Sequence, residues 1–221
     1  MINIINPLIQ VFMPSAATII LGYILDFTLS RNTLLYYFEN KAELYISGII
    51  SSFINLLIIA PINYVIAYNF LFVDKMLNGG LNLYKLFFML LTHNILYYVL
   101  HMSVHKYPNL RFIHDFHHKF IINLPSIGNA VSIYEFQFMY ILPFLVGLYF
   151  IKPNILTFNL TIYTISLFNL IIHSDELKNK YWLKIFVSPN QHCKHHHNYY
   201  GNYSAPLLNF DYLKKKIDYL F

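Results

Sequence analysis

Charged residues and cysteine are both scarce in this chain. Only 11% of its 221 residues are Asp, Glu, Lys or Arg, and 57% are hydrophobic, whereas about a quarter of a soluble domain is usually charged. This deficit argues against a soluble domain and predicts a membrane protein. Cys193 is the single cysteine, so an intrachain disulfide is excluded and nothing indicates an oxidising compartment.

Three common sequence signatures are also missing. The basic stretches border apolar segments and carry no nucleic-acid-binding motif, so we expect no nucleic-acid partner. No HExxH motif is present, which argues against that class of zinc protease. The N-terminus has no basic region, and no small-residue cleavage site follows the apolar run that ends at Leu25. We therefore expect residues 9–29 to form a retained span or an interfacial helix rather than a cleavable signal peptide.

Five apolar stretches are long enough, or nearly so, to cross a bilayer, which takes about 20 residues. They are residues 9–29, 45–72, 83–104, 131–151 and 153–172. Pro61 should kink or divide the second stretch, and Gly79-Gly80 marks a turn before the third. The turn Ile151–Asn154 is so short that the last two stretches must form an antiparallel hairpin. The sequence thus predicts an all-α integral membrane bundle of four to five apolar segments, folded as a single domain over residues 1–221.

The basic residues are unevenly distributed. Of fifteen Lys and Arg, three lie in 106–130 and seven in 174–221, including Lys214–Lys216. Such an excess is typical of cytoplasmic segments, and the lysine run is typical of a contact with lipid headgroups. We expect the two stretches to fold together as a cytosolic helical cap on the bundle.

Most of the eleven histidines fall into spaced groups. The motif HMSVH holds His101 and His105, HDFHH holds His114, His117 and His118, HCKHH holds His192, His195 and His196, and His173 ends the fifth apolar stretch. Spacings of three and four place side chains on one face of a helix, so these nine are candidate metal ligands. His93 and His197 fall outside the pattern, and we expect them to be bystanders.

The predicted topology brings the nine histidines to one membrane face. The third stretch ends at His105, the hairpin returns His173 to the side of Glu135, and the tail with the last motif starts there. Nine imidazoles exceed the four ligands of a tetrahedral zinc site but suit two ions with four or five each. Imidazole binds iron, zinc, copper and nickel, and a dinuclear iron centre that activates oxygen best suits a site beside lipid.

The order of these motifs resembles the fatty acid hydroxylase/sterol desaturase superfamily over about residues 90–213. In that family an aromatic pair precedes the first histidine box, and a Pro and a Leu separate it from the second. The stretch YYVLHMSVHKYPNLRFIHDFHH supplies these residues in register, and SPNQHCKHHHNYYGNY with Phe210-Asp211 is similar to the C-terminal motif. Membrane acyl-CoA desaturases share the box types but space the first two boxes much further apart.

The resemblance implies an oxidoreductase, a non-haem di-iron monooxygenase that uses O2 to hydroxylate or desaturate a fatty acyl chain or a sterol. It implies two iron ions held by the nine histidines, a membrane lipid substrate, and an external electron donor. That donor would be cytochrome b5 with its reductase, or a ferredoxin-type protein. In a eukaryote the enzyme would reside in the endoplasmic reticulum membrane, with the histidine boxes on the cytoplasmic face.

Four positions depart from the family pattern. Met102 stands where the family usually has Arg, and Asn94 where it has an acidic residue. Ser132 stands where the family often has His, and Asn169 where some members have His. Because the last two remove candidate ligands, a degenerate, non-catalytic member is one alternative. A membrane metal-binding or transport protein and a zinc-dependent membrane hydrolase are the others.

Residues next to the ligands complete the predicted site. Asp115 and Asp175 are candidate acceptors for ligand N–H groups, although exposed charges in polar loops are an equally good interpretation. Asn169 could contribute its amide oxygen. Cys193 lies off the ligand face of its motif, so we expect it to pack.

Overall fold

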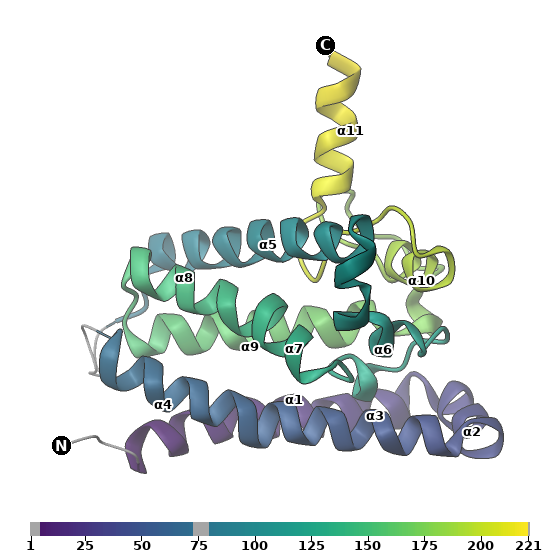
Figure 1. Ribbon diagram of the computed structural model, residues 1–221, viewed down its shortest axis with the longest axis horizontal. Coiled ribbons are helices and arrows are strands. Elements are labelled where there is room, and N and C mark those ends of the chain that lie inside the picture. Colours follow the sequence, from purple (N-terminus) through teal and green to yellow (C-terminus); the bar gives the residue numbers. More distant parts are fainter. Residues whose placement is uncertain (1–4, 73–79, 221) are drawn as a thin grey trace.

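The computed structural model of the chain describes residues 5–72 and 80–220, and this part is nearly all-helical (Figure 1). The α-helices are α1 (Ile5–Thr28), α2 (Arg31–Asn40), α3 (Ala42–Ile54), α4 (Ala60–Phe70), α5 (Leu83–Lys106), α6 (Asp115–His118), α7 (Ile133–Glu135), α8 (Leu142–Ile151), α9 (Ile155–Ile172), α10 (Pro189–Asn198) and α11 (Phe210–Leu220). Among the described residues the strand-like pairing is limited to an isolated bridge between Phe186 and Leu208. Gly79, which the sequence assigned to a turn, lies outside the described residues.

Five helical segments are long and apolar enough to cross a membrane. They are Pro7–Thr28, Ala42–Phe70, Leu83–Lys106, Ile133–Ile151 and Ile155–Ile172. Large apolar side chains point outward from them: Phe70 is 72% exposed and Phe150 74% exposed, as expected where lipid rather than protein covers a surface. The predicted helical membrane bundle is therefore confirmed, and the chain is an integral membrane protein.

Two of the spans contain a π-helical turn just before a proline. The turn η1 (Asn55–Ile59) precedes Pro61 at the start of α4, and η4 (Phe136–Ile141) precedes Pro143 at the start of α8. A proline ring lacks an N–H and clashes with the carbonyl four residues earlier, and a wider turn accommodates both defects. Pro61 therefore interrupts the regular α-helix without dividing the span.

The fourth and fifth spans form the predicted hairpin. Lys152 adopts a left-handed conformation with φ 51° and ends α8. Asn154 then caps α9, because its side chain accepts a hydrogen bond of 2.9 Å from the Thr157 N–H. This tight reversal brings the C-terminal end of α9 back to the end of the bundle from which α8 started.

A helical cap covers that end of the bundle. It contains α2, α6, α10 and the 3-10 turns η2 (Pro108–Ile113), η3 (Pro125–Ile127) and η5 (Asp175–Leu177), all at the opposite end from the α8–α9 hairpin (Figure 1). Gly48 on α3 lets the cap approach closely, because a Cβ there would lie 2.7 Å from the Phe120 ring. The cap thus packs directly on the spans, and the candidate site lies in this junction.

Candidate metal centre

The nine candidate histidines come together inside the cap, and none is more than 7% exposed. His101 and His105 lie in the last two turns of α5, His114 precedes α6, His117 and His118 end it, His173 follows α9, and His192, His195 and His196 lie on α10. The start of α10 is fixed locally. Ser188 and Gln191 form a reciprocal capping box around Pro189 at the first helical position, which orients the last motif.

The nine side chains form two groups. The five-histidine group contains His101, His105, His114, His118 and His195, and the four-histidine group contains His117, His173, His192 and His196. In each group one nitrogen per ring lies within 4.8 Å of those of the other members. Such spacing suits donors that surround one ion, so each group has the shape of a metal site.

Each HxxHH motif contributes histidines to both groups, although its spacing predicted that its three side chains would lie on a single helical face. Positions i and i+4 of a motif join one group, whereas position i+3 joins the other. Residues advance about 100° per position around a helix, so i+4 points about 40° from i, and i+3 points about 60° away on the opposite side. A short helix can therefore supply two adjacent sites, and α6 and α10 do so in a complementary way.

Main-chain carbonyls fix the orientation of four rings. The Nδ1 atoms of His101 and His195 lie 2.8 Å from the carbonyl oxygens of Tyr203 and Gly201. Those of His173 and His117 lie 2.6 and 3.3 Å from the carbonyl oxygens of Asn169 and Ala130. A carbonyl only accepts hydrogen bonds, so these Nδ1 atoms carry the proton and the Nε2 atoms carry a lone pair.

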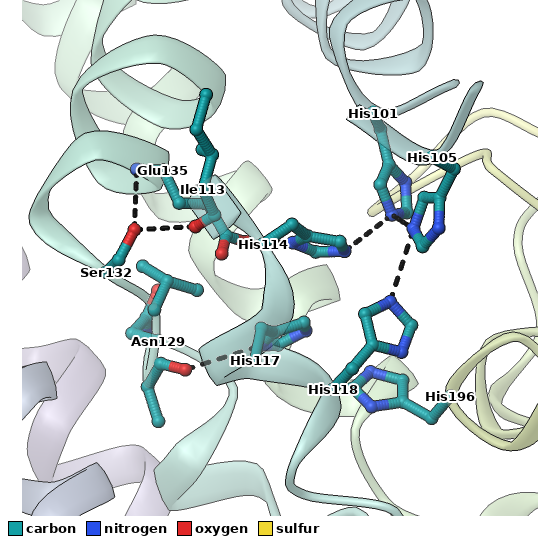
Figure 2. Close-up of polar contacts among 12 residues, drawn as sticks. His101, His105, Ile113, His114, His117, His118, Asn129, Ser132, Glu135 and His196 are labelled. Atoms are coloured by element: carbon teal, nitrogen blue, oxygen red, sulfur yellow. Dashed lines mark hydrogen bonds and ion pairs between the residues drawn. The ribbon is translucent and has the colours of Figure 1, made fainter. Parts of the chain in front are cut away.

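A carboxylate orients a fifth ring. Oε1 of Glu135 lies 2.8 Å from Nδ1 of His114, and Glu135 is fully buried. Ser132 organises this contact: its hydroxyl accepts from the Glu135 N–H at 3.0 Å and donates to the Ile113 carbonyl at 2.6 Å (Figure 2). Glu135 therefore holds His114 with Nε2 directed into the five-histidine group.

The Nε2 atoms inside each group are close neighbours. Nε2 of His101 and Nε2 of His114 lie 2.9 Å apart (Figure 2), and those of His173 and His117 lie 3.3 Å apart. Carbonyl acceptors place the proton of His173 and of His117 on Nδ1, so this pair brings two lone pairs together with no proton between them. A cation shared by the lone pairs removes this repulsion, and the donor set fits a metal ion in each group.

The histidines are neutral at physiological pH. Burial lowers the pKa of His195 to about 4, and burial together with the charge of His195 lowers the pKa of His118 to about 2. Burial, followed by repulsion from neighbouring imidazoles, also holds the pKa values of His114 and His196 well below the ordinary value. Their lone pairs are thus free for a metal, as ligation requires.

The predicted neighbours of the ligands lie elsewhere or act differently. Asp115 is exposed, and Asp175 pairs with Lys178 at 2.8 Å. Asn169 contacts His173 through its main-chain carbonyl, while its side-chain amide donates to the Gly128 carbonyl and to Oδ1 of Asn129. In the contacts that the structure describes, Glu135 and the carbonyls take the orienting role.

Three residues excluded on sequence grounds also lie outside both groups. His93 is buried against the ring of Phe144, with ring centroids 4.4 Å apart, and His197 is exposed. Cys193 is buried and accepts a hydrogen bond of 3.4 Å from Asn123. Burial raises the pKa of its thiol to about 12, so it packs as a thiol.

Two of the four residues that differ from the family pattern have structural roles. Ser132 caps α7 and links Glu135 to the segment before His114, as described above. Asn94 is fully buried, and its Oδ1 accepts the N–H groups of Leu207 and Leu208 at 3.1 Å. These two hydrogen bonds hold the loop between α10 and α11 against α5. The same loop carries the Tyr203 and Gly201 carbonyls. A carboxylate could accept the same two bonds.

Two pockets lie beside the groups. An apolar cavity between α1, α4, η4, α8 and α9 ends at Asn129 and Asn169, next to the four-histidine group. It is narrow, with a volume of only about 80 Å³. A wider polar pocket of about 270 Å³, lined by Arg111 and Tyr199, reaches His105 and His118. The histidine groups thus lie between an apolar cavity and a polar pocket.

Comparison with known proteins identifies the family. The sequence model of the family described as fatty acid hydroxylase matches residues 86–216, which is more than half of the chain and includes all nine clustered histidines. The chain belongs to the fatty acid hydroxylase family. No curated protein and no solved structure matched it. Membership of the hydroxylase family, together with the two histidine groups, supports a lipid-oxidising membrane enzyme in general.

Proposed function

We propose that this fatty acid hydroxylase family member is an O2-dependent lipid hydroxylase or desaturase with two iron ions. The observation that carries the proposal is the pair of histidine groups, in which the Nδ1 atoms of five rings face carbonyl or carboxyl oxygens and their Nε2 atoms face inward. Five and four neutral imidazoles would hold the two ions without cancelling their charge. When bound, the ions would supply activation of O2 and oxidation of a C–H bond.

The residues of the chain provide position and exclusion of water. Burial of all nine histidines limits the contact of solvent with the reaction centre, which would protect a strong oxidant from side reactions. Glu135 and the carbonyls keep the rings in one orientation, so no reorganisation is needed when a substrate arrives. The chain would thus supply the orientation and electrostatics for chemistry that belongs to the cofactor.

We propose a fatty acyl chain, rather than a sterol, as the substrate. The cavity walls are mostly apolar, and they include Phe136, Tyr140 and Ile165. A cavity this narrow fits a single flexible polymethylene chain better than a rigid four-ring system. The terminal Asn129 and Asn169 would stop the chain beside the four-histidine group. Both π turns line the cavity, and such turns often mark functional sites.

The proposed reaction needs a source of electrons. Hydroxylation converts a C–H bond and O2 into C–OH and water, whereas desaturation removes two hydrogens and reduces O2 to two waters. Each takes two electrons and two protons in addition to O2. We propose an external one-electron donor of the cytochrome b5 or ferredoxin type, which would approach the polar pocket near Arg111 and Tyr199.

Lipid analysis tests the proposed reaction. Cells that express the chain should accumulate acyl lipids that have gained one oxygen or lost two hydrogens, and the gain should require O2. Cells that express His195→Ala should lack these products. Two bound metals without any oxidised lipid, in the presence of a donor, would contradict catalysis and favour the non-catalytic alternative.

A cavity variant tests the acyl-chain part of the same proposal. Ala60 lines the cavity, so Ala60→Phe should shift the products to shorter acyl chains and leave the metal content unchanged. Ala17 is exposed on α1, which makes Ala17→Phe the matched control with an unchanged product profile. Unchanged products from Ala60→Phe would rule out this cavity as the acyl site.

We further propose that the cap faces the cytoplasm, which for a eukaryotic cell would mean the endoplasmic reticulum membrane. Arg31 at the start of α2 and Lys41 just after its end add to the ten basic residues of the two cap stretches, and such an excess favours the cytoplasmic side. Asn123 and Asn209 are buried, so exposed Lys119 and Lys180 are better labelling positions. In a Cys193→Ser background, cysteines at these two positions should react from the cytoplasm and Leu81→Cys from the opposite side. The reverse pattern would overturn the orientation.

A further inference from the structure

The C-terminal helix α11 stands apart from the bundle. The five spans run in roughly one direction, and α11 projects across that direction, away from α5 (Figure 1). Ile217 is 57% exposed and Tyr219 is 90% exposed. A free helix of eleven residues is marginal in water, so the projecting part needs a surface to lie on.

The sequence of α11 has an apolar face with lysines on both of its edges. At about 100° per residue, Phe210, Leu213 and Ile217 fall on one side of the helix. Lys214 and Lys216 flank that side, and Lys215 lies opposite to it. This arrangement is typical of helices that lie in a membrane interface, where lysine stems reach along apolar surface and their ammonium groups stay among headgroups.

The base of α11 lies at the depth where the spans meet the cap. The ring of Phe210 packs against Tyr98, with centroids 5.7 Å apart, and Tyr98 lies one turn before His101 on α5. The adjoining segment is held at a similar depth, because Phe186 packs against Phe168 of α9 at 6.0 Å. Both contacts are with helices that span the membrane, close to the ends where they leave it.

The segment next to α11 continues the same surface. The Asn209 N–H donates to the Ile185 carbonyl at 2.9 Å, which joins residues 181–186 to the start of the helix. Tyr181 is 87% exposed and Leu183 55% exposed, in a stretch that also carries Lys180 and Lys184. Aromatic and basic residues of this kind gather at membrane interfaces.

We propose that α11 lies on the membrane surface on the cap side, with its apolar face among the upper acyl chains and Lys214 and Lys216 on the phosphates of anionic lipids. Its transverse direction, its depth and its flanking lysines all fit this occupant.

This surface helix is connected to the five-histidine group. Asp211, in its first turn, accepts the N–H and the hydroxyl of Ser204 at 2.8 and 2.6 Å. Ser204 follows Tyr203 and the nearby Gly201, whose carbonyls orient His101 and His195. Binding of α11 to lipid would therefore hold in place the loop that orients two candidate ligands.

Fluorescence in lipid nanodiscs tests the proposal on the full chain. In a Cys193→Ser background, an environment-sensitive dye would be attached at Ile217→Cys, or at Lys215→Cys as the control on the opposite face. Lipids that carry a quencher just below the headgroup should quench the dye at position 217 several-fold more than the dye at 215. Emission at 217 should also shift further to the blue in discs that contain phosphatidylserine than in phosphatidylcholine discs.

Each other outcome counts against the proposal. Equal quenching at both positions would overturn the membrane-surface placement. A blue-shifted dye at 217 that persists in lipid-free amphipol and depends on protein concentration would assign the apolar face to a second copy. Equal emission in both disc types would exclude the role of the lysines. None of these readouts depends on bound iron or on lipid oxidation, so they are independent of the proposed function.

Discussion

Replacement of His195 or His196 by alanine should abolish lipid oxidation, but with different effects on bound metal. His196→Ala leaves three imidazoles in the four-histidine group, so we expect the metal content to fall from two per chain toward one. His195→Ala leaves four imidazoles in the five-histidine group, so it should retain more metal than His196→Ala does. The loss of product should exceed the roughly 10–100-fold typical of residues that only orient a ligand. Elemental analysis and product assays on purified protein provide the measurements.

The adjacent histidine is the control for both variants. His197 is exposed one position along α10, so His197→Ala should keep both metals and activity. A loss of metal from His197→Ala equal to that from His196→Ala would mean that the motif is assigned in the wrong register. Fewer than two metals in the unmodified chain, after supply of iron during expression, would contradict the two-site interpretation.

Loss of the Glu135 carboxylate should have the next largest effect. Glu135→Leu would leave Nδ1 of the buried His114 without its acceptor, and the ring could then place its proton on Nε2. Glu135 is fully buried, and a buried anion without a counter-charge is very costly. Its carboxylate would therefore also offset the charge of a cation bound in the five-histidine group. We expect metal affinity of the five-histidine group and product formation to fall by about 10–100-fold.

The amide variant separates orientation from charge. Glu135→Gln keeps an oxygen that can accept from Nδ1 of His114, so it should rescue the ring orientation but not the negative charge. Competition with a chelator for the bound metal should rank the unmodified chain first, Glu135→Gln second and Glu135→Leu third. Equal affinities for all three would show that Glu135 has no part in the metal centre.

Hydropathy and charge predicted the bundle because each span must be apolar and must form its backbone hydrogen bonds within its own segment. A stretch such as 153–172 has no charge, and its helix can be read from the sequence without knowing its neighbours. The turn at Lys152–Asn154 was equally local. The π turns were not predicted. Pro61 and Pro143 indicate that the helix is irregular nearby, but they do not indicate whether it kinks, ends or widens there.

The histidine motifs predicted which side chains gather in the two groups, but the residues that orient their rings depend on tertiary contacts. The carbonyls of Gly201 and Tyr203 have no sequence signature, since every residue has a carbonyl. Glu135, in contrast, has a sequence signature. Ser132 and Glu135 form an S-x-x-E pattern that marks the start of a helix, and this pattern places the carboxyl group one turn after the N-cap residue Ser132. Asp115 and Asp175 attracted attention because they neighbour histidines in the chain, but helix geometry directs them away from the groups.

The division of each HxxHH motif between two sites has a consequence for cohesion of the fold. With both ions bound, α5, α6, α9 and α10 would be cross-linked through coordinate bonds, and neither ion could leave without loosening a helix that also serves the other. Such ties close loops of the chain and so restrict its unfolded ensemble, much as disulfides do. In a membrane protein with a single, buried cysteine, metal–imidazole bonds would thus provide the cross-links that disulfide bonds provide in secreted domains.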